Sequence, residues 1–446
     1  MQLVSSNSNR SHVFVVLGFV LGIFVGTVLL GMPQAVPEGQ LPLSLSEAFF
    51  TSTSAVCVTG LTVVSTCQDL SFWGQGVLLA LFQLGGLGVM TLAVLVFESL
   101  RRRIAGQSGE LLEHTLSDYV FQGNPRRTLA FVLGGTLFME TLGFCLLYPT
   151  FAQEPNPAWN ALFLSVSAFC NAGFDNLQYG LAPYAENSTV AFTLSSLWLA
   201  GGFGFILPAA IHAWLRKGTK RLDASARMIL WSGFALILLG PALYWLTESN
   251  GGLLSSYPTT KQAVLSFFQG NTSRTAGFSM MDLSEARRIT LLTIIPLMLI
   301  GAAPGGTAGG MKTTTLWIFL AALAAHIRGQ RKVVLYGRRI PQGIVRRSIL
   351  ICSMMTALWA GLTGLLALLD TASRFSLEAL SFEAASALGT VGLSTGITSE
   401  LPLGSQMALA VAMFIGRLGP LTVAWALFRS LPEDPLDYPD GAIPVG

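Results

Sequence analysis

Hydrophobic residues are concentrated in eight long runs, each long enough to cross the roughly 30 Å hydrocarbon layer of a bilayer as a helix. The predicted spans lie near 12–32, 72–98, 127–149, 189–215, 226–247, 287–328 (interrupted), 346–369 and 404–428. Within each successive pair of spans lies a shorter apolar run, at 44–56, 157–170, 260–272 and 376–389. These runs are too short to cross a bilayer, so we expect short re-entrant helices. Ser44, Asn156, Thr260 and Ser376 are candidate caps at their starts.

A three-residue segment ending in glycine follows each short run. The four segments are Val58-Thr59-Gly60, Asn171-Ala172-Gly173, Thr275-Ala276-Gly277 and Thr390-Val391-Gly392. Their glycines are separated by 113, 104 and 115 residues, which predicts the order helix, short helix, glycine loop, helix, four times over. The predicted repeats are 1–100, 101–216, 217–330 and 331–430, with a C-terminal tail at 431–446.

A second set of glycines supports the fourfold repeat. Gly85-Gly86-Leu87-Gly88, Gly201-Gly202-Phe203-Gly204 and Gly416-Arg417-Leu418-Gly419 begin 25, 28 and 24 residues after their loop glycines. In the third repeat, Gly301 lies 24 residues after Gly277. Two independent registers that agree over four repeats predict an all-α membrane protein with four tandem repeats around a central axis.

Composition narrows the functional class. Of 446 residues, 52% are hydrophobic and 11% are charged, against about 25% charged in soluble domains, so we expect a polytopic membrane protein. A net charge of +3 is too small to mark a nucleic-acid-binding surface. The five cysteines show no metal-binding spacing. No Ser/His/Asp or Cys/His arrangement is visible, so the sequence does not predict an enzyme.

The distribution of Lys and Arg predicts the orientation. Nineteen of the 26 lie at one set of helix ends. The side with the short helices has few cations and instead carries acids such as Glu38, Glu47, Asp69, Glu154, Asp175, Glu186, Asp282 and Glu400. By the positive-inside rule, both termini are expected in the cytoplasm, with the glycine loops opening outward. Acidic groups there would raise the local cation concentration.

The repeat itself suggests a function. Non-helical backbone is tolerated at membrane depth only where it is buried in protein or lines a water-filled cavity, so four such loops most simply meet on one axis. Their carbonyl oxygens could replace the hydration shell of an ion, and glycine places no side chain in the path. The loops carry no carboxylate, so the pattern favours a monovalent cation over a divalent one.

The interrupted span of the third repeat is a candidate gate. The segment 301–312 is rich in glycine and contains a proline, enough to break a helix. Its candidate gating residues are Gly305, Gly306, Thr307, Gly309, Gly310 and Lys312. Arg417 lies within an otherwise apolar span, where an arginine is costly and usually faces a cavity or a polar partner. We expect it below the glycine loops, bonded to carbonyls of this segment. Snorkelling or helix capping is an equally good interpretation of Lys312.

With its four glycine loops and the stretch Gly305-Gly306-Thr307-Ala308-Gly309-Gly310-Met311-Lys312, the chain resembles the Trk/Ktr/HKT potassium transporter superfamily, and most closely its KtrB-type membrane subunit. The resemblance implies potassium ligands from the carbonyls of the four glycine loops, and a gate at 301–312. Glycine in all four loops favours potassium, because sodium-selective relatives often have serine in the first.

The resemblance also implies partners and a location. KtrB-type subunits form homodimers in the plasma membrane and are controlled by a cytosolic nucleotide-binding ring of KtrA type. The chain itself is expected to hold no cofactor, only the transported K⁺. Whether Na⁺ stimulates uptake as a co-ion stays open. The alternatives are a proton-linked Trk-type or Na⁺-conducting member, and a secondary transporter of another solute, which would instead predict inverted repeats.

Overall fold

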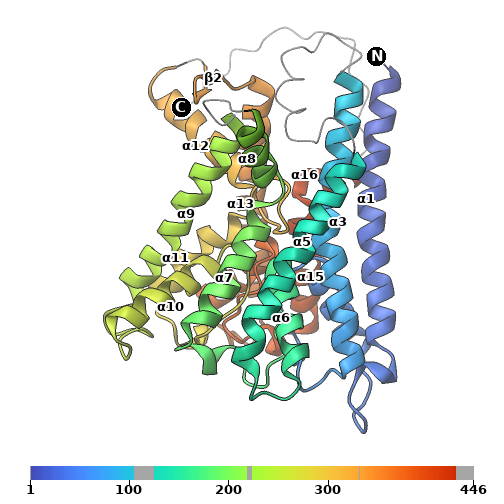
Figure 1. Cartoon of the computed structure of the whole chain (residues 1–446), viewed down its shortest axis with the longest axis vertical. Helices are drawn as coiled ribbons and strands as arrows, with labels where there is room; N and C mark the ends of the chain where they lie inside the picture. The colour runs from blue at the N-terminus through green and yellow to red at the C-terminus, as the bar shows by residue number, and fades with distance from the viewer. Residues whose placement is uncertain (1, 105–124, 218–223, 331, 428–446) are drawn as a thin grey trace.

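The computed structural model describes residues 2–104, 125–217, 224–330 and 332–427, which form an elongated bundle of helices (Figure 1). The first half of the described chain contains α1 (Gln2–Leu30), α2 (Leu45–Val56), α3 (Phe72–Ile104), α5 (Pro125–Leu147), α6 (Pro157–Cys170), α7 (Ser188–Phe203) and α8 (Ile206–Lys217). The second half contains α9 (Ala224–Glu248), α10 (Thr259–Thr272), α11 (Arg288–Leu299), α12 (Thr313–Ile327), α13 (Gln342–Leu369), α14 (Leu377–Gly389), α15 (Leu403–Leu418) and α16 (Pro420–Leu427). The predicted tail, 431–446, lies outside the described residues.

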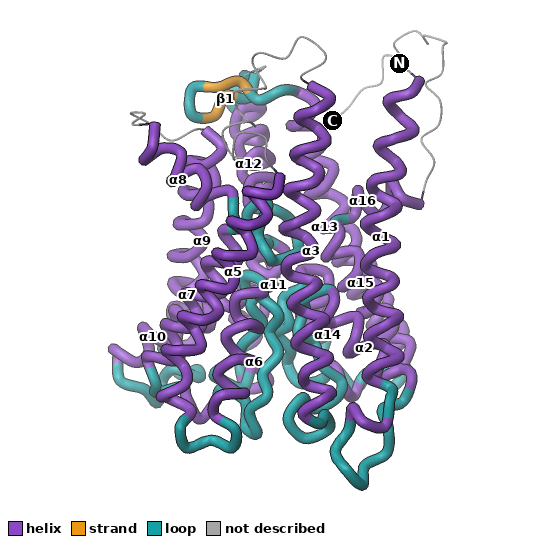
Figure 2. Tube along the Cα trace, turned by 45° about the vertical axis from the view of Figure 1, so that its right-hand side comes forward, coloured by secondary structure: helices purple, strands orange, loops and turns teal. Residues whose placement is uncertain are grey.

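A small hairpin stands at the end of the bundle nearest the N-terminus (Figure 2). Its strands, β1 (Val334–Leu335) and β2 (Arg338–Arg339), pair antiparallel with Val334 opposite Arg339. Arg227 at the start of α9 donates a hydrogen bond to the Tyr336 carbonyl and stacks over the Tyr336 ring. The hairpin is therefore tied to the helical bundle.

The four short helices α2, α6, α10 and α14 begin and end within one residue of the predicted runs. Ser44 and Glu47 form the capping box at the start of α2, and Ser376 caps α14 through the Ala379 amide. Asn156 occupies the predicted N-cap position before Pro157, but its backbone is left-handed and its side chain makes no capping hydrogen bond. The prediction for Thr260 was wrong, because Thr260 lies inside α10, whose N-cap is Pro258.

Two predicted spans, 189–215 and 404–428, are each divided into two helices. The breaks fall at Gly204 and Gly419, which have φ angles of 64° and 84°, a region that glycine adopts at little cost. A side chain at Gly204 would collide with Gly305, since its Cβ would lie 2.4 Å from the Gly305 carbonyl carbon. The first break therefore makes room for the 301–312 segment. α3 is helical throughout the corresponding region.

Helix packing closes a ring. Each short helix contacts the helix that follows the preceding glycine loop, in the pairs α3–α6, α7–α10, α11–α14 and α15–α2. The last pair joins the C-terminal part of the described chain to its N-terminal part. Non-helical segments, drawn in teal, run through the middle of the bundle between the helices (Figure 2).

The outer surface of the bundle is apolar. Leu21 and Phe24 of α1, Phe138 of α5 and Leu238 of α9 are all more than half exposed, which a soluble monomer rarely tolerates over a large area. Three of the described helices have segments long and apolar enough to cross a membrane: Leu129–Phe151, Ala224–Glu248 and Gln342–Leu369. Shorter apolar helices, including Ser188–Phe203 and Leu403–Leu418, pack among them.

Candidate functional site

The four glycine loops meet in a closed ring. A Cβ added to Gly60 would lie 2.6 Å from the Ala172 carbonyl oxygen, and one added to Gly173 would lie 3.0 Å from the Ala276 oxygen. In the same way, Gly277 faces the Val391 oxygen at 2.5 Å and Gly392 faces the Thr59 oxygen at 2.1 Å. Each glycine thus abuts the carbonyl of the residue before the glycine in the next loop, and a side chain at any of the four would fill the centre.

The backbone conformation is the same in all four loops. The first residues Val58, Asn171, Thr275 and Thr390 have φ angles of 52–66°, and the four glycines have φ angles of 71–95°. A left-handed conformation costs a residue with a side chain about 1–3 kcal/mol and is found mostly at functional sites. Val58, Thr275 and Thr390 are β-branched, and β-branching makes the left-handed conformation still more costly. Four equivalent strained residues therefore mark the ring as the candidate site.

Serine residues near the C-terminal ends of three short helices accept hydrogen bonds from the backbone amides of the glycine loops. The amides of Thr59, Ala172 and Val391 donate to the carbonyls of Ser54, Ser167 and Ser386 at 2.8 Å each. The hydroxyls of Ser54 and Ser386 also accept the amides of Gly60 and Gly392 at 3.1 Å. Sequence reasoning missed these residues. Their constant distance from the glycine, six positions before it, was the signal that could have identified them.

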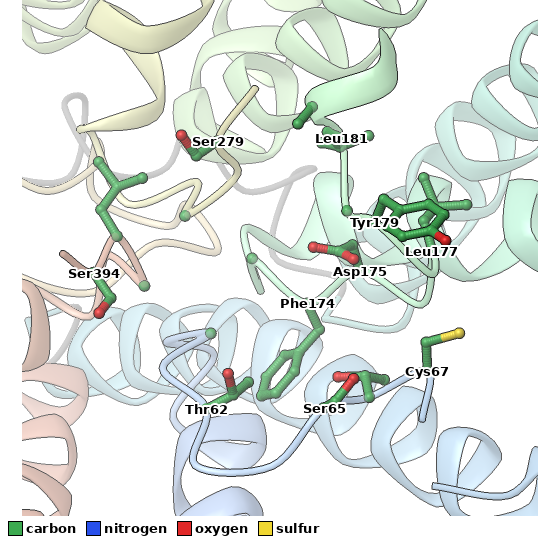
Figure 3. Close-up of a pocket in the computed structure, with 18 of the residues that line it drawn as sticks. Thr62, Ser65, Cys67, Phe174, Asp175, Leu177, Tyr179, Leu181, Ser279 and Ser394 are labelled. Carbon is green, nitrogen blue, oxygen red and sulfur yellow. The ribbon is translucent and has the colours of Figure 1, made fainter. Parts of the chain in front are cut away.

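A cavity of about 430 Å³ opens above the ring, and all four loop glycines line it. We call it the mouth cavity. Figure 3 shows its wall, where Thr62, Ser65 and Cys67 face Phe174 and Asp175 across the opening. Of the acids expected on this side, Asp175 and Asp282 line the cavity. Burial raises the pKa of the Asp175 carboxyl to about 6, and a hydrogen bond from the Leu177 backbone opposes the shift.

The 301–312 segment lies on the other side of the ring and is anchored to other repeats. The amides of Ala303 and Thr307 each donate to α7, to the carbonyls of Gly202 and Gly201 at 3.1 Å. The Gly310 amide donates to the Gly416 carbonyl of α15 at 3.2 Å. A Cβ on Gly309 would lie 2.2 Å from the Thr390 hydroxyl, so the segment directly abuts the fourth glycine loop.

Arg417 joins this segment to the first repeat. It is 4% exposed and donates to the carbonyls of Thr307 and, at 2.6 Å, Gly85. Its expected contact with a carbonyl of the 301–312 segment is therefore present. Lys312 donates to the Ala308 carbonyl of its own segment at 2.8 Å and is the residue immediately before α12. The Thr307 and Ala308 carbonyls lie in the non-helical segment and therefore have no helical partner, whereas Gly85 lies within the continuous helix α3.

The second set of glycines has a packing role. A Cβ on Gly85, Gly201 or Gly416 would lie 2.0–2.2 Å from the carbonyl oxygen of Val56, Phe169 or Leu388, respectively. Each of these three carbonyls belongs to the residue two positions before its left-handed loop residue. The glycines therefore let the following helix press against the end of the short helix, which fixes the position of the loop.

The groups that face the ring are backbone carbonyl oxygens, which are the ligands expected for a monovalent cation. In the described part of the chain, His, Cys, Asp and Glu form no cluster of three or more that could hold a metal ion. The ring therefore offers neutral carbonyl oxygens, and the acidic side chains of Asp175 and Asp282 lie in the mouth cavity next to it.

The chain is similar to known proteins over nearly its whole length. The family model for TrkH, described as "Cation transport protein", matches residues 24–437. The Ktr system potassium uptake protein B of Vibrio alginolyticus is 35% identical over 439 residues, covering 97% of this chain and 94% of that protein. The potassium/sodium uptake protein NtpJ of Enterococcus hirae is 33% identical over 436 residues, covering 96% of each.

A similar structure has also been solved. The crystal structure of the potassium transporter TrkH from Vibrio parahaemolyticus superposes with a TM-score of 0.69 and 18% identity, covering 93% of this chain and 85% of that one. At that identity, the likeness concerns the fold alone. The family match and the full-length similarity to Ktr-type proteins together establish that the chain belongs to the TrkH family of cation transport proteins.

Proposed function

We propose that this chain is the membrane subunit of a Ktr-type system and conducts K⁺ into the cell through the ring of glycine loops. The observation that carries the proposal is the closed ring itself, in which each loop glycine abuts a carbonyl oxygen of the next loop. The names of relatives that take up potassium support it.

The mechanism follows from the geometry of the loops. A cation enters the mouth cavity, where the carboxylates of Asp175 and Asp282 attract it. It then exchanges its water for carbonyl oxygens of the three residues in each loop. The C-terminal ends of α2, α6, α10 and α14 run into the loops, so their partial negative charges favour a cation at the ring. The membrane potential drives it inward, contributing about 2.3 kcal/mol per charge for each 100 mV.

The selectivity proposal is K⁺ over Na⁺. Glycine in all four loops leaves the path lined by carbonyls alone, which suits the larger and more easily dehydrated ion. Na⁺ conduction is the second candidate, because the similar protein NtpJ is named for uptake of both ions.

The 301–312 segment is proposed to act as the gate. It lies directly below the ring, and its contacts to α7, α15 and Arg417 hold it there. With five glycines in the ten residues from Gly301 to Gly310, its backbone can move without steric penalty. Arg417 would also repel a cation beneath the ring while the gate is closed.

The assembly proposal is a homodimer in the plasma membrane with both termini in the cytoplasm, controlled by a cytosolic nucleotide-binding ring of KtrA type. The basic segment 328–347, which includes the hairpin, provides exposed cations such as Arg328, Lys332 and Arg339 for such a partner. Stimulation of uptake by Na⁺ is part of the same proposal.

The test is K⁺ uptake by cells that lack their own uptake systems, with and without Na⁺. The chain should restore uptake, and Gly277→Asp should abolish it because the added side chain would occupy the ring. Gly39→Asp is the matched control, since Gly39 has a φ of 90° but no neighbour within 4 Å of an added Cβ. Equal uptake by the two variants at equal expression would remove the ring from the pathway.

A second experiment addresses the gate. Arg417→Ala removes both carbonyl contacts and should raise basal K⁺ flux several-fold, as should a partial deletion within Gly301–Gly310. An unchanged flux in folded protein would assign Arg417 and the segment to packing.

A further inference from the structure

One partly buried cation has no role in the mechanism described so far. Arg274 lies in the third repeat directly before Thr275, where the other loops have Cys57, Cys170 and Gly389. Among these equivalent positions, only the third repeat carries a charge. Its Nε and Nη1 atoms are buried and have no hydrogen-bond partner in the described part of the protein. An orphaned guanidinium of this kind is rare, because unpartnered buried donors are costly.

The surroundings of Arg274 connect the ring to the 301–312 segment. Arg274 lines a small cavity of about 20 Å³ together with Asn171 of the second glycine loop, Gly202 of α7, and Ala302, Ala303 and Thr313. The Thr313 hydroxyl is likewise buried without a partner. Ala302 and Thr313 lie at the two ends of the 301–312 segment. The cavity is therefore lined at both points about which the segment would have to bend.

Two of the residues that line this cavity, Ala302 and Ala303, have backbone carbonyls that already accept hydrogen bonds. The Ala302 carbonyl accepts the Thr313 amide at 3.1 Å, and the Ala303 carbonyl accepts the Gly306 amide at 3.0 Å. These bonds exist only while the segment keeps its present fold. If the segment refolded so that both bonds broke while its ends stayed at this cavity, the two carbonyls would lose their partners beside the unpartnered Nε and Nη1 donors of Arg274.

We infer that Arg274 is a positioning residue for the gate: its guanidinium binds carbonyls of the 301–312 segment when the segment is displaced and so stabilises the open arrangement. This inference rests on the proposed gating role of the segment. Arg274 and Arg417 then act in opposite directions, because Arg417 holds the segment in place through Thr307. Arg274, in the third predicted repeat, thus stabilises the open arrangement, and Arg417, in the fourth, stabilises the closed one.

A native cysteine supplies a readout that does not depend on transport. Cys352 is 8% exposed, and its Sγ lies 3.2 Å from the Sδ of Met311 in the segment. Displacement of the segment should uncover this thiol. Its rate of modification by N-ethylmaleimide in membranes, measured by mass spectrometry of the peptide that contains it, therefore reports on opening.

The experiment compares Arg274→Gln and Arg274→Lys in the wild-type and Arg417→Ala backgrounds. We expect Arg417→Ala to raise both K⁺ flux and Cys352 labelling several-fold. Arg274→Gln should reverse most of that rise, whereas Arg274→Lys, which keeps a donor and the charge, should retain it. If Arg274→Gln leaves both readouts at the Arg417→Ala level, Arg274 has no role in opening and the inference is overturned.

Gly202→Ala provides an independent variant in case Arg274→Gln does not fold. Its added methyl would make only ordinary contacts, 3.7 Å from the Asn171 amide nitrogen and 3.9 Å from the Ala302 Cβ, and would narrow the cavity from the opposite side. It should lower both readouts in the Arg417→Ala background; no change would count against the inference. If Arg417→Ala itself changes neither readout, the gating proposal fails instead, so the two failures are distinguishable.

Discussion

Residues that begin the glycine loops hold a conformation that their side chains disfavour. Val58, Thr275 and Thr390 are β-branched and have φ angles of 56°, 66° and 52°, where about 1–3 kcal/mol of strain per residue is typical. All three are essentially fully buried. The residues that follow Val58 and Thr390 are also held in place, because the amides of Thr59 and Val391 donate hydrogen bonds to the carbonyls of Ser54 and Ser386. Local strain is thus offset by packing around the loops, which keeps the carbonyls preorganised.

At the residue scale, Asp175 predicts a pH dependence. Its pKa of about 6 means that the carboxyl is ionised above pH 6 and neutral below it. Its negative charge in the mouth cavity should therefore attract K⁺ at pH 7 and be lost by pH 5. We expect the K⁺ concentration for half-maximal uptake to rise about two- to fivefold over that range.

The measurement is uptake against external K⁺ at pH 5, 6 and 7. In Asp175→Asn, the K⁺ concentration for half-maximal uptake should equal the low-pH value at all three pH values. The stability of this variant at pH 7 should not fall, because ionising a carboxyl of raised pKa costs the folded state free energy. Glu38→Gln is the control, because Glu38 is exposed and does not line the cavity. A persistent pH dependence in Asp175→Asn would place the titrating group elsewhere.

At the scale of the elements, hydrophobic run lengths predicted the short helices well and the broken ones poorly. A run of fixed length and capping residues such as Ser44 are local properties, so α2, α6, α10 and α14 could be located from sequence. The breaks at Gly204 and Gly419 could not, because the sequence around them is as apolar as a continuous helix. The break at Gly204 depends on contact with Gly305, a residue of another repeat.

The glycines of α3 give a matched test of close helix packing. Gly85→Ala would place a Cβ 2.2 Å from the Val56 carbonyl, whereas Gly88→Ala, one turn later, would meet nothing within 4 Å. We expect Gly85→Ala to displace α3 from the end of α2, lowering both the thermal midpoint of the purified protein and K⁺ uptake. Gly88→Ala should change neither, and similar losses in both variants would mean that helix glycine content, rather than contact, matters.

For the whole molecule, the four glycine loops could be predicted as a set, but not their order around the ring. Two registers of glycines predicted four repeats, but sequence alone could not show which loop faces which. The closure comes from contacts such as that of Gly392 with Thr59, between residues more than 300 positions apart. Arg417 spans a similar separation to reach Gly85. Such contacts leave no local pattern in the sequence.

The proposed orientation of the whole chain can be tested with its own cysteines. Cys67 lines the mouth cavity, whereas Cys57, Cys170 and Cys352 are buried. If the cavity opens outward, a membrane-impermeant thiol reagent applied to intact cells should label Cys67 and block K⁺ uptake. Burial, with Asp175 and Glu154 nearby, raises the pKa of the Cys67 thiol, so labelling should be faster at pH 9 than at pH 7, because the thiolate is the reactive form.

Cys67→Ser is the control for this experiment and should keep uptake while abolishing the block. External K⁺ should also slow the labelling, since a cation that occupies the cavity competes with a positively charged reagent for the same carboxylates. Labelling only after the cells are opened would invert the topology and place the mouth cavity in the cytoplasm. Labelling from outside without loss of uptake would leave the orientation standing but remove the cavity from the path of the ion.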